Sequence, residues 1–306
     1  MEGQIDKQIS LGSSSLQGIS RRDQSTQIFL RILQRIRRQR LMVVGLLILL
    51  VFSIIVIFPG IFATHDPYQI AVTDKHLPPS ADHWFGTDEL GRDIYSRVIF
   101  GMRVSFTAGL VVVAGGMLLG AILGMIAGYL ENHADDLIMR TADVFLAFPG
   151  LVMAMAFVAT LGPGLNNAML ALIIIWWPQY ARLTRSLTLT VKHNYYVEAS
   201  RALGAGSARI LMTHVLPNIF PTIFVKGTLD LGIAVLVTAA LSFLGLGAQP
   251  PSPELGAMVT AGRTFLLTSW WYSTFPGLII FLGVLAVNLV GDGLRDILDP
   301  VLGRGA

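Results

Sequence analysis

The side chains of this 306-residue chain that could do chemistry are few, and none stands in a familiar catalytic spacing. The sequence lacks His-Glu-x-x-His, Gly-x-Ser-x-Gly and the phosphate-cradling Gly-x-x-x-x-Gly-Lys-Ser/Thr. It also lacks cysteine, which excludes a disulfide framework, a thiolate metal site and a cysteine nucleophile. We therefore predict no catalytic residue, no bound cofactor and no metal site in this chain.

Histidine and carboxylate meet in one polar segment, where His83 is followed by Asp88 and Asp93. These side chains are of the types that bind divalent metals. Because His and Asp in a polar loop usually face water, we favour solvent exposure over a metal site. The remaining histidines lie in loops or at the ends of apolar runs: His65, His76, His133, His193 and His214.

Four charged residues lie within or beside apolar runs, namely Asp143, Arg182, Lys226 and Asp230. Charge inside a membrane is a pointer to function by default. These positions fall within a few turns of the ends of the runs, and Lys226 and Asp230 are four residues apart, so they can pair on one helix face. We interpret all four as interfacial or packing groups, which weakens the hypothesis of a carrier driven by an ion gradient.

A polar stretch from Glu198 to Pro217, with basic flanks, separates two long apolar runs. Tyr196, Ala199 and Leu203 in and beside it fall at helical spacing. One face of a short helix can therefore dock on another protein.

The ends of the helices in this stretch are also marked in the sequence. We expect Asn194 to cap the first helix and Gly204 to end it. Ser207 is expected to cap a second short helix, which Pro217 stops before the next apolar run.

The composition is typical of a membrane protein. Hydrophobic residues make up 53% of the chain and charged residues 13%, about half the roughly 25% of a soluble domain. The net charge is +3, and the basic residues flank apolar runs, which favours membrane topology over nucleic-acid binding. A long polar stretch precedes the first apolar run, so we expect that run to be a retained membrane helix.

Six apolar runs match the length needed to cross a bilayer core about 30 Å thick. The chain is predicted to be an all-α integral membrane protein with six transmembrane helices, over residues 41–62, 104–129, 137–161, 168–190, 221–246 and 273–290. Small residues every four positions in the second run predict close helix packing. Pro149 and Gly150 predict a kink or tight packing in the third.

These runs divide the chain into segments. Residues 1–40 form a tail that includes a basic amphipathic helix over 26–40 in the lipid interface. Residues 63–103 form a polar segment outside the membrane, residues 104–293 hold the five further helices, and residues 294–306 form a second tail.

Basic residues are unequally divided between the two sides of the membrane. Most lie on the side of the two termini and of residues 195–217, whereas the opposite side carries many carboxylates and only Lys75, Arg92, Arg97, Arg103 and Arg263. The positive-inside rule therefore places both termini and the polar stretch in the cytoplasm.

The polar stretch resembles the Glu-Ala-Ala, three residues, Gly, nine residues, Ile-x-Leu-Pro loop of ABC-type importer permeases. Ser200 replaces the second alanine, and His214 stands where isoleucine is usual. The resemblance implies a cytoplasmic coupling helix at about 195–217 that docks on an ATPase. The residues to which it assigns this role are Glu198, Ala199, Ser200, Leu203, Gly204, Leu216 and Pro217.

Four further segments are similar to the second permease subunit of dipeptide and oligopeptide importers. They are Gly-Thr-Asp-Glu-Leu-Gly-Arg-Asp at 86–93, Leu-Ala-Phe-Pro at 146–149, Leu-Gly-Leu-Gly-Ala-Gln-Pro-Pro at 244–251 and Gly-Asp-Gly-Leu-Arg-Asp at 291–296. The resemblance covers about residues 41–302.

The resemblance implies a type I ABC importer permease fold in the cytoplasmic (inner) membrane of a bacterium or archaeon. The chain would form half of the pathway for dipeptides or oligopeptides. Implied partners are a second, different permease, two cytoplasmic ATPase subunits or domains that bind ATP and Mg, and an extracytoplasmic solute-binding protein that delivers peptide. Membrane lipid surrounds the chain, and no nucleic acid is expected.

Other functions stay open at this level. Importers of nickel, glutathione and opines share the same kind of subunit, although the shortage of histidine at span centres argues mildly against nickel. A secondary carrier is a weaker alternative, and the lack of a catalytic constellation argues against an intramembrane enzyme.

Overall fold

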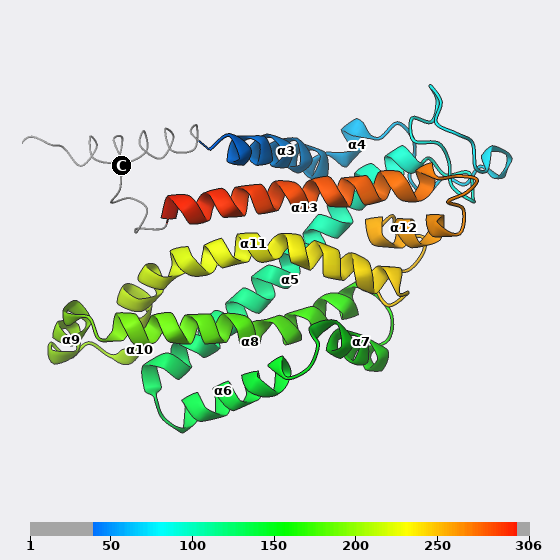
Figure 1. Ribbon diagram of the computed structural model, residues 1–306. Helices are drawn as coiled ribbons and strands as arrows, with labels where there is room; N and C mark the ends of the chain where they lie inside the picture. The colour runs from blue at the N-terminus through cyan, green and yellow to red at the C-terminus, as the bar shows by residue number, and fades with distance from the viewer. Residues whose placement is uncertain (1–38, 299–306) are drawn as a thin grey trace, which may run out of the picture.

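The apolar runs fold into helices in the computed structural model, which describes residues 39–298 (Figure 1). The helices, in chain order, are α3 (Arg40–Ile57), α4 (Pro59–Phe62), α5 (Ile94–Leu130), α6 (His133–Leu146), α7 (Gly150–Leu161), α8 (Leu165–Lys192), α9 (Tyr195–Ala202), α10 (Ser207–Ile210), α11 (Leu216–Phe243), α12 (Leu255–Arg263) and α13 (Trp271–Leu298). A 3-10 turn covers Val72–Asp74, and a π-helical turn covers Leu211–Val215.

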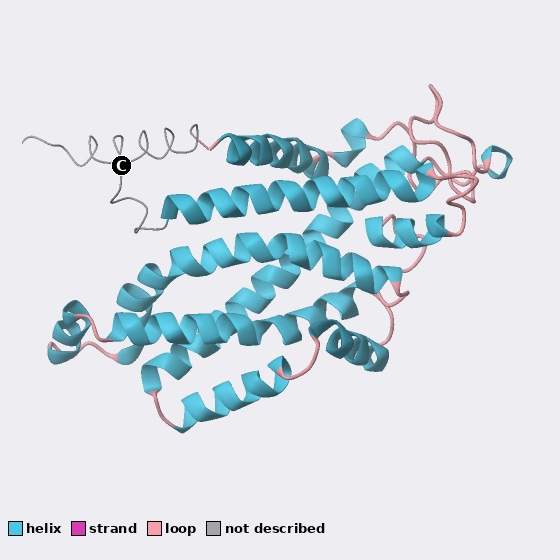
Figure 2. Ribbon diagram, viewed as in Figure 1, coloured by secondary structure: helices cyan, strands magenta, loops and turns pink. Residues whose placement is uncertain are grey.

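The part of the chain that the structure describes holds helices and loops without a strand, so the prediction of an all-α protein is confirmed (Figure 2). Most of the amphipathic helix expected over 26–40 lies outside the described residues, as does the end of the second tail beyond residue 298.

Four of the described helical segments are long and apolar enough to cross a membrane: Arg40–Ile57, Ile94–Leu130, Ser207–Phe243 and Trp271–Ile297. The pair α6 and α7 makes a fifth if the two count as one bent span. Helix α8 is 28 residues long, but its second half carries Arg182, Arg185 and Lys192, and it is not among these segments. The count of six spans therefore stays a prediction.

Two helices have other bounds than the spans predicted over them. Helix α5 begins at Ile94, ten residues before the predicted second span, because the Asp93 carboxylate accepts a hydrogen bond of 2.8 Å from the Ser96 N–H and caps the helix. The predicted first span, 41–62, is divided at Phe58 between α3 and α4. Pro59 cannot donate to the α3 ladder and disfavours helical geometry at the residue before it.

The kink predicted at Pro149 is confirmed. Helices α6 and α7 meet at 95° across residues 147–149, where the proline has no N–H to continue the ladder of α6. The third apolar run is thus a broken helix rather than a straight span.

Helices α5 and α8 form an extensive contact, through glycines of α5. A Cβ atom at Gly120 would lie 2.4 Å from the Trp177 carbonyl oxygen, and one at Gly124 would lie 2.4 Å from the Ala181 carbonyl oxygen. The absent side chains let the two backbones approach closely, as the spacing of small residues predicted.

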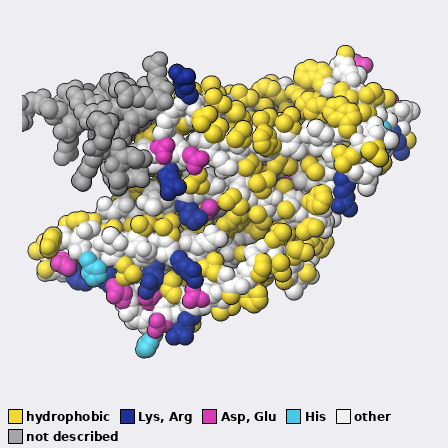
Figure 3. All heavy atoms as spheres, viewed as in Figure 1, with side chains coloured by type: hydrophobic (Ala, Val, Ile, Leu, Met, Phe, Trp, Pro, Cys, Tyr) yellow, Lys and Arg dark blue, Asp and Glu magenta, His cyan; other side chains and the backbone are white. Residues whose placement is uncertain are grey.

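The bundle has two distinct ends (Figure 1). At one, here called the α9 end, helix α9 lies beside the ends of α5 and α8, and α13 also ends on this side. At the other, the α12 end, α12 lies near the loops of residues 63–93. Charged side chains gather toward the α9 end, whereas hydrophobic ones dominate the rest of the visible face (Figure 3).

Candidate functional site

Helix α9 stands out from the bundle at the α9 end (Figure 1). Asn194 is its N-cap by backbone conformation, as predicted, although its side chain makes no capping hydrogen bond. The Asn194 carbonyl instead accepts from the N–H groups of Val197 and Glu198, at 2.9 and 3.2 Å. The first helix of the polar stretch therefore begins where the sequence indicated.

Gly204 ends α9 with a φ of +85°. Its N–H donates to the Arg201 carbonyl at 2.9 Å, and the Ala205 N–H donates to the Ser200 carbonyl at 3.1 Å. These two hydrogen bonds form a Schellman motif. Gly204 occupies its left-handed position, which glycine adopts without a Cβ clash. The predicted end of the helix is confirmed, and the motif turns the chain back toward the membrane helices.

One face of α9 is buried and the other is bare. Val197 is fully buried in the cluster that also holds Tyr129 and Ile210. Tyr195 and Leu203 are each 90% exposed. A helix that packs on the bundle along one side, with large apolar side chains open on the other, is suited to dock on another surface.

The second half of the polar stretch differs from the prediction. Gly206, not Ser207, is the N-cap of α10, and Ser207 is the first helical residue. Pro217 does not stop the helix: α10, the π-helical turn and α11 follow one another without a break, as one candidate span over Ser207–Phe243. Pro217 directly follows the π-helical turn, where the hydrogen-bond ladder of the helix changes register.

The structure separates the predicted coupling residues into two groups. Glu198 and Ala199 are exposed on α9, with Ser200 half-buried, and Leu203 and Gly204 follow at its exposed end. Leu216 packs against the main core cluster from the start of α11, and Pro217 beside it is exposed. Only the first group can meet a partner as a continuous surface.

His214, the residue that departs from the usual motif, is half-buried in the π-helical turn. Its ring meets that of Tyr196 edge-on, with the centroids 5.9 Å apart. The histidine therefore packs α9 against the start of α11, which is a role that an aromatic ring fills better than a small side chain.

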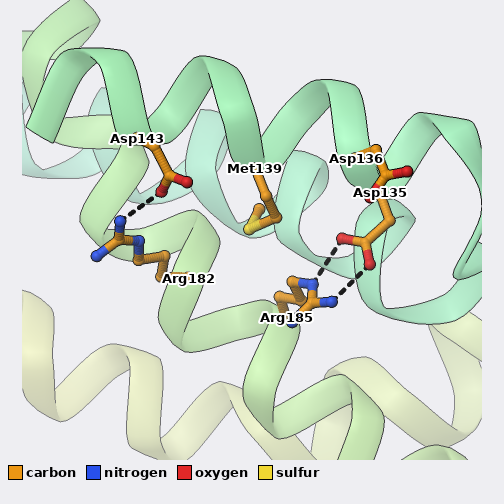
Figure 4. Close-up of a pocket in the computed structure, with 6 residues that line it drawn as sticks. All are labelled: Asp135, Asp136, Met139, Asp143, Arg182 and Arg185. Atoms are coloured by element: carbon orange, nitrogen blue, oxygen red, sulfur yellow. Dashed lines mark hydrogen bonds and ion pairs between the residues drawn. The ribbon is translucent and has the colours of Figure 1, made fainter.

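Two ion pairs, here called the charged seam, join α6 to α8 (Figure 4). The Arg185 guanidinium donates twice to the Asp135 carboxylate, at 2.6 and 2.5 Å, and Arg182 donates to Asp143 at 2.5 Å. The side chains line an open hollow of about 470 Å³ together with Asp136 and Met139. Sequence reasoning noted Asp143 and Arg182 but missed that they pair, because they are 39 residues apart.

Lys192 closes the same end of α8 onto the end of α5. Its ammonium donates to the Tyr129 carbonyl at 2.8 Å and to the Glu131 carboxylate at 2.5 Å. The hydrogen bond from Lys192 lowers the pKa of the Glu131 carboxyl. The contacts of α8 with α5 and with α6 are thus both joined by ion pairs.

Lys226 and Asp230 pair on α11 as predicted, with 2.9 Å between ammonium and carboxylate. The Lys226 ammonium also lies 5.4 Å from the centre of the Tyr180 ring. This charge is neutralised within the bundle, in keeping with a packing role.

The loop cluster proposed from His83, Asp88 and Asp93 is rearranged in the structure. The Asp88 carboxylate pairs with the guanidinium of Arg92 at 2.6 Å and lies 3.6 Å from that of Arg97. His83 does reach Asp93, at 2.9 Å. The expectation that this group simply faces water was wrong, because Asp88 and Asp93 are both buried.

Comparison with known families decides what kind of protein carries this helix. A model of the binding-protein-dependent transport system inner membrane component matches residues 120–304, which include the broken third run, α9 and the Schellman turn. The chain belongs to this family. A model of the N-terminal TM domain of oligopeptide transport permease C matches residues 28–79. The resemblance stated from the sequence motifs is confirmed.

Several curated relatives of this permease carry substrate names. It is 48% identical over 263 residues to the probable D,D-dipeptide transport system permease protein of Escherichia coli (strain K12), covering 86% of this chain and 88% of the relative. It is 45% identical over 267 residues to a di/tripeptide transport system permease protein of Pseudomonas aeruginosa, covering 84% and 88%. A glutathione transport system permease protein of Pectobacterium atrosepticum is 48% identical over 224 residues, covering 73% and 74%.

The fold also occurs in a solved structure. An inward-facing conformation of the MetNI methionine ABC transporter matches with a TM-score of 0.53 and 20% identity, covering 66% of this permease and 96% of that chain. The similarity supports the helical arrangement of the permease core.

Proposed function

We propose that this permease is one transmembrane subunit of an ATP-driven importer and forms half of the pathway for dipeptides or oligopeptides. The observation that carries the proposal is α9: an exposed apolar face, closed by the Gly204 turn, in a chain of this family. Peptide is the favoured substrate class because relatives at 42–48% identity over most of the chain are named as dipeptide or di/tripeptide permeases.

The proposed membrane arrangement has six spans. They are α3, α5, the bent pair α6 and α7, α8, α11 and α13, which brings both termini to one side. The excess of basic residues favours the cytoplasm for the α9 end and the exterior for the α12 end. The membrane is then the cytoplasmic (inner) membrane of the cell.

In the proposed mechanism the energy for transport enters at α9. Two ATPase subunits bind ATP and Mg outside this chain, which has no phosphate-cradling loop of its own. Closure of the ATPase pair moves α9, and the continuous helix from α10 into α11 carries that movement into the membrane. A second, different permease supplies the other half of the pathway, and a solute-binding protein delivers peptide at the α12 end.

The proposal is tested by placing a charge on the exposed apolar face of α9. Leu203→Glu and Ala199→Glu are each expected to reduce uptake of a labelled dipeptide at least tenfold, because a charge on the apolar face opposes docking, while the permease stays in the membrane. Leu203→Met is the matched control, since it keeps an apolar side chain at the same exposed position. Wild-type uptake in the Leu203→Glu strain would overturn the coupling role.

The absence of cysteine makes the topology directly testable. A single cysteine at Leu203 should react with a membrane-impermeant maleimide only after the cells are opened, and one at Leu267 should react in intact cells. The reverse pattern would overturn the assigned orientation without affecting the fold.

Glutathione is the second candidate substrate, because permeases named for it are 44–48% identical to this chain. Uptake of labelled dipeptide and of labelled glutathione, compared in a strain lacking the chain and in the complemented strain, separates the two. Restoration of glutathione uptake alone would replace the peptide assignment.

A further inference from the structure

Three polar side chains from separate parts of the outer segment converge at the start of α5. His65 precedes the polar loops, His83 lies within them, and Asp93 caps α5. The two imidazole rings lie against each other, with their centroids 4.8 Å apart. The Asp93 carboxylate contacts both: one oxygen is 2.9 Å from Nδ1 of His83, and the other is 3.8 Å from Nδ1 of His65. The three potential ligand atoms all lie within 4.8 Å of one another.

These positions are held by contacts other than those of the cluster itself. The His65 N–H donates to the Ser96 hydroxyl at 2.9 Å, so the backbone of His65 is fixed to the first turn of α5. The His83 N–H donates to the Ser80 hydroxyl at 3.1 Å, in a turn closed by the Ser80 N–H on the His83 carbonyl. The cluster is therefore built by the backbone and does not depend on the two imidazoles meeting.

The charge of Asp93 has no arginine to balance it among the described residues. Arg92 and Arg97, its nearest basic neighbours in sequence, pair with Asp88 and Glu89. Within the part of the chain that the structure describes, Asp93 forms ion pairs with the two imidazoles alone, and its side chain is 1% exposed. A buried carboxylate calls for a positive partner.

We propose that His65, His83 and Asp93 bind a divalent transition-metal ion, Zn²⁺ in the first place. Two imidazole nitrogens and one carboxylate oxygen form a ligand set that zinc accepts, with a fourth position left for water. Hard ions such as Mg²⁺ prefer oxygen ligands throughout and fit this set poorly.

The geometry suits such an ion after a small adjustment. Bonds of about 2.0 to 2.1 Å in a tetrahedral site place ligand atoms about 3.3 Å apart. The observed separations of 2.9 and 3.8 Å lie on either side of that value. His65, whose side chain is partly exposed, can move to close the longer one. It also borders an open hollow of about 420 Å³, so water reaches its side of the cluster.

Neighbouring groups already hold the ligands as an outer shell. The Ser96 N–H donates to the Asp93 carboxylate at 2.8 Å, and the Thr64 hydroxyl lies 3.4 Å from the same carboxylate. Outer contacts of this kind orient metal ligands. A bound ion would fasten the loops of residues 65–83 to α5, in the segment proposed to receive the solute-binding protein.

Metal binding by the full-length permease in lipid nanodiscs tests the site, with a purification tag that contains no histidine. After removal of metal by a chelator, equilibrium dialysis against Zn²⁺ is expected to give one tight site per chain that excess Mg²⁺ does not compete away. His83→Gln and Asp93→Asn are expected to weaken zinc binding about tenfold or more. His76→Gln is the matched control, because His76 lies in the same segment but packs on Phe265, and it should bind like wild type.

X-ray absorption of the zinc-loaded wild type supplies a readout that does not depend on the variants folding. Two imidazoles with one or two oxygen ligands support the site. Absence of a stoichiometric zinc, equal binding by wild type and His83→Gln, or a spectrum without two imidazoles would each overturn it. None of these outcomes bears on peptide uptake through α9, so the two proposals fail separately.

Discussion

The Ser105 hydroxyl in α5 donates a hydrogen bond of 2.8 Å to the carboxylate of Glu254, 149 residues further along the chain. Both side chains are buried. The same Ser105 oxygen accepts from the Leu255 N–H at 3.1 Å, and the other Glu254 oxygen accepts from the Ala257 N–H at 2.8 Å and caps α12. One serine and one glutamate thus fix the short helix α12 against α5, the longest helix of the bundle.

Ser105→Ala is expected to destabilise the permease by about 1–3 kcal/mol, because it leaves a buried carboxylate oxygen and the Leu255 N–H without their partner. Thermal unfolding in detergent measures the loss. Thr107→Ala is the control, since Thr107 is exposed on the same helix and its hydroxyl bonds only to the Arg103 carbonyl of its own turn. Equal effects of the two changes would mean that the link between α5 and α12 adds nothing.

Gly204→Ala is expected to loosen the end of α9 by about 1 kcal/mol, the approximate lower cost of a left-handed conformation for a residue with a Cβ. Amide hydrogen exchange at residues 203–205 should then be about fivefold faster. Gly206→Ala is a close control: an added Cβ would meet open space at either glycine, but Gly206 has φ of −68°. Faster exchange in both variants would mean that the loss of any glycine in this segment, rather than the left-handed turn at Gly204, causes the change.

Gly124→Ala is expected to cost about 1–3 kcal/mol, because the new Cβ would lie 2.4 Å from the Ala181 carbonyl oxygen and force α5 and α8 apart. Gly115→Ala serves as the comparison on the same helix. Its Cβ would meet the Cδ1 atom of Ile173 at 2.7 Å, the movable end of a side chain. Gly124→Ala should therefore show a lower free energy of unfolding in detergent than Gly115→Ala. The opposite order would contradict a backbone contact at Gly124.

Local signals in the sequence located much of this structure. The bend at Pro149 and the turn at Gly204 were both predicted, because each depends on the backbone properties of one residue. The start of α5 was missed because Ser96 and Arg97 interrupt its apolar pattern, and they are buried only by contacts to distant loops, such as the bond from Arg97 to the Pro67 carbonyl.

The candidate sites show the same difference between local sequence signals and contacts between distant segments. The stretch proposed for coupling was visible as a spaced motif in one segment, although the continuous helix from α10 through Pro217 was not. The convergence of His65 with His83 and Asp93, and the link from Ser105 to Glu254, join residues that no local period relates. Such pairs become visible only when the loops and helices are placed in space.

The two ion pairs between α6 and α8 are expected to differ in strength although their lengths are similar. Arg185 holds the largely buried Asp135 with two hydrogen bonds, whereas the side chains of Arg182 and Asp143 are 54% and 59% exposed. An exposed pair contributes about 0–1 kcal/mol, because water screens it. Arg185→Ala should therefore cost about 1–3 kcal/mol, since it leaves a largely buried carboxylate without its partner, and Arg182→Ala under about 1 kcal/mol.

A double-mutant cycle separates pairing from the loss of side-chain contacts. Arg185→Ala with Asp135→Ala should show a coupling free energy of about 1 kcal/mol or more, and Arg182→Ala with Asp143→Ala one near zero. Arg185→Lys is expected to fall between wild type and Arg185→Ala, because an ammonium keeps the charge but cannot match the carboxylate with a planar fork. Equal coupling in the two pairs would show that burial at Asp135 does not set the strength of the seam.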